Sequence, residues 1–240
     1  MLLGIDTSGA VSVAVARGEL PGTDESAPAA ELEILAVRSD ARSRHHYEVL
    51  LALVEETLQA AGVTREELTG VVVGRGPGPF TGLRVGLVSA RSIAAVLGLP
   101  LHGLSSLDAL AHQALADVPA DRGPVTVAVA LDARRREVYH ARYRRETDGA
   151  VTRTAEPAVH APAEVAAELT GCDLLVGSGT ALYPELLPAT AEIEHVDAGH
   201  LLRAAAELAA RGEDLTSTEP MYLREPDAAK PTARKSALGR

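Results

Sequence analysis

The same succession of features occurs twice along this chain, and this repetition restricts its fold more than any other feature does. In each half, an apolar strand pattern ends in an aspartate, Asp6 and then Asp132, which a turn and a second strand follow. Later in each half, a short apolar run leads into Gly-x-Gly, at 74–76 and at 177–179. A pattern that recurs in this order predicts a duplicated α/β protein.

The spacing of apolar residues predicts the individual elements, because alternation indicates strands and a three- or four-residue spacing indicates helices. In the first half we expect strands at 2–7, 11–17, 31–39 and 70–74, and helices at 46–61 and 82–97. In the second half we expect strands at 125–131, 137–144, within 150–160, 173–177 and 193–196, and helices at 162–169, within 178–187 and at 201–211. Each half thus follows the order βββαβα, which is the actin-like (ASKHA) architecture of Hsp70 and sugar kinases, with two lobes facing across a cleft.

We place the boundary between the lobes near 103–105, which gives an N-terminal lobe at 1–104 and a C-terminal lobe at 105–225. Two segments carry no apolar pattern: the 18–30 loop, rich in Pro, Gly, Ser, Ala and acids, and the 226–240 tail. Because such segments cannot bury enough apolar surface, we expect a mobile loop and a disordered tail.

Composition narrows the class of protein. The net charge of −10, one Phe, five Tyr and no Trp argue against independent nucleic-acid binding, which needs basic patches and stacking platforms. The single cysteine, Cys172, forms no internal disulfide and fits a reducing compartment. No run approaches the roughly 18 apolar residues of a membrane span, and the start MLLGIDTSG has no basic region of a signal peptide. We therefore expect a cytoplasmic protein without membrane contact.

Several catalytic motifs are absent. A Walker P-loop needs a lysine after its glycines, but the lysines are Lys230 and Lys235, in the tail. No two of the eight histidines lie four residues apart, as a zinc protease would require. The Gly-x-Ser-x-Gly elbow of hydrolases is incomplete around Ser105 and Ser178. We expect no catalytic residue, no metal ligand and no enzymatic activity of the chain on its own.

The Gly/Pro-rich loop RGPGPFTG at 75–82 has two readings. Its glycines allow close backbone approach and Thr81 can cap the following helix, so the loop could bind an anion; alternatively it is a rigid elbow. Asp6 and Asp132 likewise suit either a magnesium-water site or the capping of a hairpin turn through an Asx bond. A vestigial phosphate site would comprise these residues: Asp6, Thr7, Gly76, Gly78 and Asp132.

Two further patterns leave alternatives open. Gly82, Gly86, Ala90 and Ala94 form a stripe of small residues on one helix face, suited to packing on the chain's own sheet or on a partner helix. The second hairpin carries Arg134–Arg136 beside Glu137, which we interpret as a solvated, charged turn.

Four segments resemble the TsaB (YeaZ) family, in order along nearly the whole chain. They are IDTS at 5–8, GRGPGPFTGLRVG at 74–86, DAR and EVY within 132–139, and EPMYLRE at 219–225. The run at 74–86 is highly specific, and it departs from the family at Pro79, where serine is expected. The resemblance implies the actin-like fold.

The resemblance also implies a function. Proteins of this family are partners of TsaD, a paralogue, and act with the ATPase TsaE to install threonylcarbamoyl on N6 of adenosine 37 in tRNAs that read ANN codons; TsaC supplies the activated donor. TsaD carries a metal-binding His-x-x-x-His in the segment corresponding to 103–110, and this chain lacks it. We therefore expect a non-catalytic subunit that contacts tRNA through the complex and binds no cofactor tightly. A nucleotide, ATP or ADP, at the level of the complex stays open.

In the family, the helices matching 46–61 and 82–97 pack on their TsaD counterparts, and they can also form a homodimer. The implied interface residues are Tyr47, Leu50, Leu51, Val54, Leu58, Phe80, Thr81, Gly82, Val85, Gly86, Ser89, Ala90 and Ile93. On this basis Gly86→Leu should abolish heterodimerisation and leave the monomer folded.

The alternative functions are an actin-fold kinase or phosphatase that uses Asp6 and Asp132, a peptidase, and a homodimeric binding module without a role in tRNA modification.

Overall fold

The computed structural model describes residues 1–20, 32–41 and 46–224, without the side chains of 46–48, and it contains two mixed β-sheets. The first sheet has the strand order β3-β2-β1-β4-β5, and the second has the order β8-β7-β6-β9. The first comprises β1 (Leu2–Asp6), β2 (Val11–Arg17), β3 (Glu33–Asp40), β4 (Gly70–Gly74) and β5 (Leu101–Leu104). The second comprises β6 (Val125–Asp132), β7 (Val138–Arg145), β8 (Val151–His160) and β9 (Leu174–Val176).

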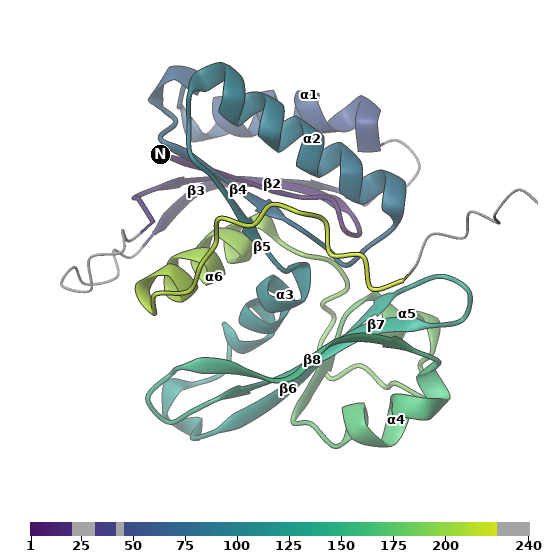
Figure 1. Ribbon diagram of the computed structural model, residues 1–240. Helices are drawn as coiled ribbons and strands as arrows, with labels where there is room; N and C mark the ends of the chain where they lie inside the picture. The colour runs from purple at the N-terminus through teal and green to yellow at the C-terminus, as the bar shows by residue number, and fades with distance from the viewer. Residues whose placement is uncertain (21–31, 42–45, 225–240) are drawn as a thin grey trace, which may run out of the picture.

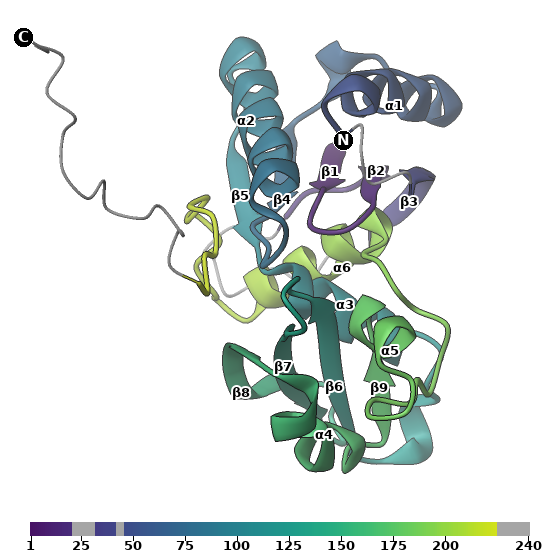
Figure 2. The ribbon, with the colours of Figure 1, turned by 90° about the vertical axis from the view of Figure 1, so that its right-hand side faces the viewer.

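Helices alternate with the two sheets in layers (Figure 1). Helices α1 (His46–Ala61) and α2 (Phe80–Leu97) cover one face of the first sheet. Its other face packs on α6 (Ala198–Ala210), and α6 packs on α3 (Ser106–Leu115), which reaches the second sheet. The far side of the second sheet carries α4 (Pro162–Thr170) and α5 (Ser178–Leu182), as Figure 2 also shows. Short 3-10 turns lie at Arg65–Glu67 and Ala120–Arg122.

The central strand β1 explains why the first sheet forms. All five of its residues are buried, because helices cover both faces. It pairs antiparallel with β2, with Ile5 opposite Val13, and parallel with β4, with Ile5 opposite Val73. A parallel strand covered on both faces is expected to be continuously apolar, and LLGID and GVVVG follow this rule until each reaches the cleft end of the sheet.

The predicted elements are largely confirmed, with the following corrections. No strand forms at 193–196, and the sequence analysis did not predict β5 or α3. Helix α2 begins at Phe80 with Pro79 as its N-cap residue, so Thr81 lies inside the helix and does not cap it. The last helix begins at Ala198, because Asp197 caps it by accepting hydrogen bonds from the backbone N–H groups of Gly199 and His200.

The two halves of the sequence do not form two structurally independent lobes. Helix α6 lies in the range expected for the second lobe, but it packs on β1 and β2 of the first sheet. Its first N–H group, that of Ala198, donates a hydrogen bond to Ser12 Oγ. The predictions for the 18–30 loop and the 226–240 tail fall mostly or wholly outside the described residues.

Helix α2 is more apolar than the sequence analysis expected, because that analysis found no run approaching the length of a membrane span. Over its 18 residues the mean hydropathy is 1.4, which by length and composition alone suffices to cross a membrane. However, 33% of this stretch is buried in the protein, where Leu83 and Leu87 belong to the core of the first sheet. Packing on the sheet therefore accounts for part of its apolar composition, and the exposed side chains of Val88 and Val96 account for another part.

A half-buried histidine lies in the layer between the sheets. The side chain of His112 on α3 faces α6, with its Nδ1 atom 3.3 Å from Nδ1 of His200. Burial, aided by the positive His200, Arg203 and Arg211, lowers the pKa of His112 to about 4. The Glu207 carboxylate, 3.6 Å from Nε2, would favour protonation, but burial raises the pKa of Glu207 itself, so desolvation dominates.

We expect this histidine to make the folded state sensitive to acid. Its folded pKa of about 4 lies below the ordinary value of 6.5, so the unfolded chain binds the proton more readily between these values. The free energy of unfolding should therefore fall by up to about 3 kcal/mol as the pH drops from 6.5 to 4. Urea titrations at several pH values would show a shallower fall for His112→Asn; parallel curves for the two proteins would contradict the assignment.

Candidate functional site

The exposed side of the helix pair α1 and α2 carries an unusual amount of apolar surface. Large hydrophobic side chains there are strongly exposed: Val96 by 83%, Leu51 by 61%, Val88 by 60% and Phe80 by 49%. Among the described residues, the remaining exposed side chains of this kind are Leu182, Leu186 and Tyr222. A concentration of exposed apolar groups on one pair of helices is typical of a protein interface.

A groove runs between the two helices. It has a volume of 980 Å³, and Val54 and Leu58 of α1 face Ile93 and Val96 of α2 across it. A second, shallower hollow of 470 Å³ lies over the N-terminal half of α2, where its lining includes Leu51, Phe80 and Val88. Leu51 lines both hollows, so they form one continuous surface, which we call the helix-pair surface.

The structure divides the predicted interface residues into two groups. Leu51, Leu58, Phe80, Thr81, Val85, Ser89 and Ile93 are exposed or half-buried on the helix pair. Leu50, Val54, Gly82, Gly86 and Ala90 are buried. The side chain of Tyr47 lies outside the described residues. Val88 and Val96 are exposed members that the prediction missed, although the helical period of α2 places both beside predicted residues.

The stripe of small residues on α2 packs on the chain's own sheet. A Cβ atom at Gly86 would lie 2.2 Å from Thr7 Oγ1, and Thr7 donates a hydrogen bond to the carbonyl of Gly82 over 2.8 Å. The prediction that Gly82, Gly86 and Ala90 contact a partner is therefore corrected, because their close approach to β1 leaves no room for one. For the same reason Gly86→Leu is not expected to leave the monomer folded.

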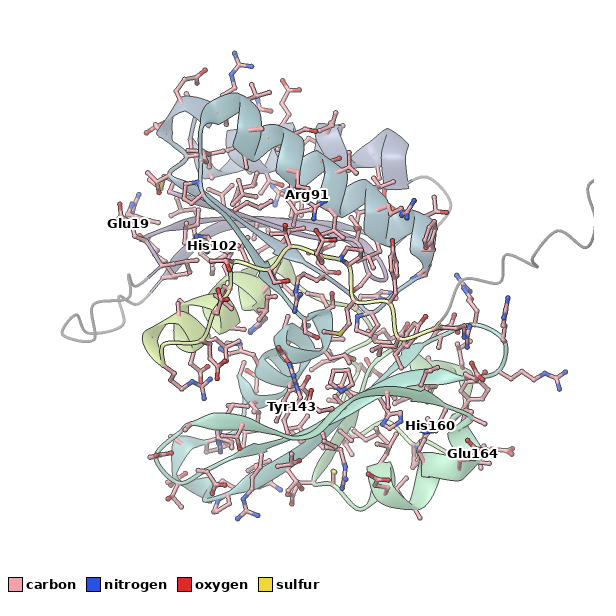
Figure 3. All side chains as sticks on the ribbon, viewed as in Figure 1. Glu19, Arg91, His102, Tyr143, His160 and Glu164 are labelled. Atoms are coloured by element: carbon pink, nitrogen blue, oxygen red, sulfur yellow. The ribbon has the colours of Figure 1, made fainter. Side chains whose placement is uncertain are left out.

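The C-terminal segment 213–224 borders the helix-pair surface. Figure 3 shows Arg91 on α2 beside this segment, where its guanidinium donates to Thr218 O and to a Glu219 carboxylate oxygen, each over 2.8 Å. At the start of α2, the rings of Phe80 and Tyr222 stack with centroids 5.3 Å apart. Arg84 lies over the Phe80 ring at 3.9 Å and donates to the Tyr222 hydroxyl. Phe80 is thus fixed in place while half its surface stays exposed.

The cleft between the sheets is the second candidate site, as the actin-like prediction requires. It has a volume of 460 Å³, and its charged lining residues are Asp132, Arg134, Glu194 and His195. Asp132 accepts a hydrogen bond from the backbone N–H of Arg134 and pairs with its guanidinium at 3.0 Å. The Asx reading of Asp132 is therefore confirmed.

The other members of the predicted phosphate site are not free to bind a ligand. Asp6 is fully buried and accepts hydrogen bonds from the N–H and hydroxyl of Ser8 and from the Ser106 hydroxyl. Burial raises the pKa of Asp6, and these hydrogen bonds oppose the rise. Its carboxylate tethers the first hairpin to α3, a structural role that the sequence left open.

The Gly/Pro loop packs closely on other parts of the protein. A Cβ atom at Gly78 would lie 2.6 Å from the carbonyl oxygen of Ser8, and one at Gly76 would lie 2.9 Å from the Leu83 side chain. The Gly76 carbonyl also accepts a hydrogen bond from the backbone N–H of Ser106. These contacts support the rigid-elbow reading of this loop, and the phosphate site stays a prediction.

Comparison with known proteins identifies the family of this chain. Residues 37–230 match the family described as TsaD: tRNA N6-adenosine threonylcarbamoyltransferase. The chain is 31% identical over 192 residues to the Escherichia coli tRNA threonylcarbamoyladenosine biosynthesis protein TsaB, covering 75% of this chain and 81% of that protein. It is 41% identical over 206 residues to an uncharacterized Mycobacterium tuberculosis protein, covering 85% and 86%.

Two solved structures from Pseudomonas aeruginosa share the fold. One, titled as an uncharacterized protein with similarity to peptidase YeaZ, has a TM-score of 0.72 at 30% identity and covers 93% of this chain and 99% of that one. The other, YeaZ, has a TM-score of 0.70 at 29% identity and covers 92% and 99%. The chain therefore belongs to the TsaB (YeaZ) family, whose members act in the biosynthesis of threonylcarbamoyladenosine in tRNA.

Proposed function

We propose that this protein is a cytoplasmic, non-catalytic subunit that binds a TsaD-type enzyme and holds it in its active arrangement. That enzyme would transfer threonylcarbamoyl to N6 of adenosine 37 in tRNAs reading ANN codons. The observation that carries the proposal is the helix-pair surface, where Leu51, Val88 and Val96 are each exposed by at least 60%. A second helix pair that covers these side chains removes apolar surface from water, which stabilises the complex.

The geometry of the cleft supports a subunit that leaves catalysis to its partner. Of the aspartates that an actin-like ATPase would use, Asp6 is sealed from the cleft and Asp132 is occupied by Arg134. The segment where TsaD carries its His-x-x-x-His forms the start of α3, and its Asp108 is bound by Tyr143 and Arg153. These contacts hold β7 and β8 against α3.

TsaE would bind the complex of the two paralogues, a nucleotide would be bound by that complex, and the isolated protein would pair with itself through the same helix-pair surface. We also infer that the two lobes are duplicates. Both sheets share the order third, second, first and fourth strand of their half, which supports this inference.

The test is reconstitution of tRNA threonylcarbamoylation with the host's TsaC, TsaD and TsaE, in the presence and absence of this protein. We expect product in its presence, none in its absence, and none from this protein alone. Equal product without it would refute the proposed function. Intrinsic ATP hydrolysis by the pure protein, abolished in Asp132→Ala, would instead favour the kinase or phosphatase alternative.

A further inference from the structure

The C-terminal segment 213–224 contains no helix or strand, and it carries most of the motif EPMYLRE at 219–225. Figure 1 shows it in yellow, passing between α2 and the second sheet. Its residues are exposed or half-buried, apart from the buried Leu215. Packing in the core therefore does not by itself explain the position of this segment.

Hydrogen bonds fix the segment to the ends of strands from both sheets. The Arg75 guanidinium, just after β4, donates to the Ser217 hydroxyl over 2.9 Å. The Arg75 carbonyl accepts a hydrogen bond from the N–H of Met221 over 2.8 Å. At the end of the segment, Arg224 donates to the carbonyl of Ala133, just after β6, over 3.0 Å. The backbone between these points is thus held in a defined position.

Tyr222 lies between these fixed points and packs on α2. Its ring stacks on Phe80 with the centroids 5.3 Å apart and an angle of 24° between the planes, and its hydroxyl accepts a hydrogen bond from Arg84 over 2.8 Å. Despite these contacts, Tyr222 is 40% exposed and Phe80 is 49% exposed. Aromatic rings that are already fixed lose little conformational entropy when a second protein covers them, so this pair is suited to binding.

The two rings join the C-terminal segment to the helix-pair surface. Phe80 and Arg84 line the hollow of 470 Å³ that contains Val88. Phe80 also lines an adjoining hollow of 400 Å³, together with Met221 and Tyr222 of the segment. Because Phe80 belongs to both hollows, a partner that covers Val88 and extends past Phe80 meets Tyr222.

We propose that the C-terminal segment is a second contact element for the TsaD-type enzyme, with Tyr222 as its contact residue. The hollow beside Tyr222 suits an apolar side chain of the enzyme, because its lining includes Pro79, Met221 and Leu223. Tyrosine is enriched among the residues that dominate the binding free energy of protein interfaces. The inference rests on the proposed function, and it extends the interface beyond the helix pair to a segment more than 100 residues further along the chain.

The test measures the affinity of the full chain for the purified TsaD-type enzyme by titration calorimetry. Tyr222→Ser removes the ring, whereas Tyr222→Phe keeps the stack and removes the hydroxyl alone. The matched control is Leu186→Ser, because Leu186 is 41% exposed, close to the 40% of Tyr222, and lies beyond α5 of the second lobe. Phe80→Ala, with and without Tyr222→Ser, separates a contact made by Tyr222 from mere support of the Phe80 ring. Val88→Asp serves as the reference for the helix-pair surface.

We expect Tyr222→Ser to bind the enzyme roughly tenfold more weakly, and Tyr222→Phe and Leu186→Ser to bind within about threefold of the unmodified protein. In the Phe80→Ala background, Tyr222→Ser should still weaken binding by roughly threefold or more. The Tm of each isolated variant should stay within about 2 °C of the unmodified protein, which excludes unfolding as the cause.

Normal affinity of Tyr222→Ser would overturn the inference. The absence of a further loss in the Phe80→Ala background would also overturn it, because Tyr222 would then only position Phe80. In either case, weak binding by Val88→Asp would leave the proposed function intact. If the unmodified protein does not bind the enzyme, or if Val88→Asp binds it normally, the proposed interface fails together with its extension.

Discussion

Val88→Asp is expected to weaken binding to the TsaD-type partner at least 100-fold while the isolated protein stays folded. Val88 is 60% exposed and lies in the hollow between Leu51 and Phe80, so its replacement removes little from the core. In a complex the new carboxylate would be buried without a partner, and such a change at the centre of an interface costs about 3 kcal/mol or more. Analytical ultracentrifugation or titration calorimetry with the purified enzyme would measure the loss.

The matched control is Leu186→Asp, which places the same charge on an exposed apolar residue, 41% exposed, beyond α5 of the second lobe. We expect it to bind the partner normally. Thermal unfolding of both isolated variants should stay within about 2 °C of the unmodified protein, as for other surface substitutions. If Val88→Asp binds normally, the helix-pair surface is not the partner interface.

Gly86→Leu is expected to destabilise the isolated protein by about 4 kcal/mol, a large part of the stability of a domain of this kind. Helix propensity alone would favour leucine by up to about 1 kcal/mol. Against this, the first carbon of the side chain would lie 2.2 Å from Thr7 Oγ1, so the helix must move off β1 and the Thr7–Gly82 hydrogen bond must break. Overpacking and a lost buried hydrogen bond each cost about 1–3 kcal/mol, so they outweigh the gain in propensity.

Chemical denaturation of the isolated protein measures this effect. Ala95→Leu, at an exposed position of the same helix, is the control and should leave the midpoint nearly unchanged. If the Gly86→Leu protein stays folded and only fails to bind its partner, our prediction is wrong. The small residues would then face outward, as the sequence analysis expected.

The comparison of Val88 with Gly86 shows where sequence reasoning about the site reaches its limit. A stripe of small residues with a four-residue period permits close packing, but the period is the same whether a sheet of the chain itself or a partner helix approaches. The location of α2 over β1 and β4 decided this question, and the outward face carries Val88 and Val96. The environment of Asp6 was out of reach for a related reason, because Ser106 donates a hydrogen bond to it from 100 residues away along the chain.

Elements whose signals are local could be predicted from the residues alone. Helix α1 was predicted with its observed bounds, as was strand β4, since periodicity and the flanking glycines act within a few residues. The Asx bonds of Asp6 and Asp132 span two residues and were among the predicted alternatives. The placement of α3 and α6 between the sheets, and of the glycine loop against Ser8, became visible only in the folded protein. These contacts join segments far apart in the chain, where packing and burial, and not local propensity, set the free energy.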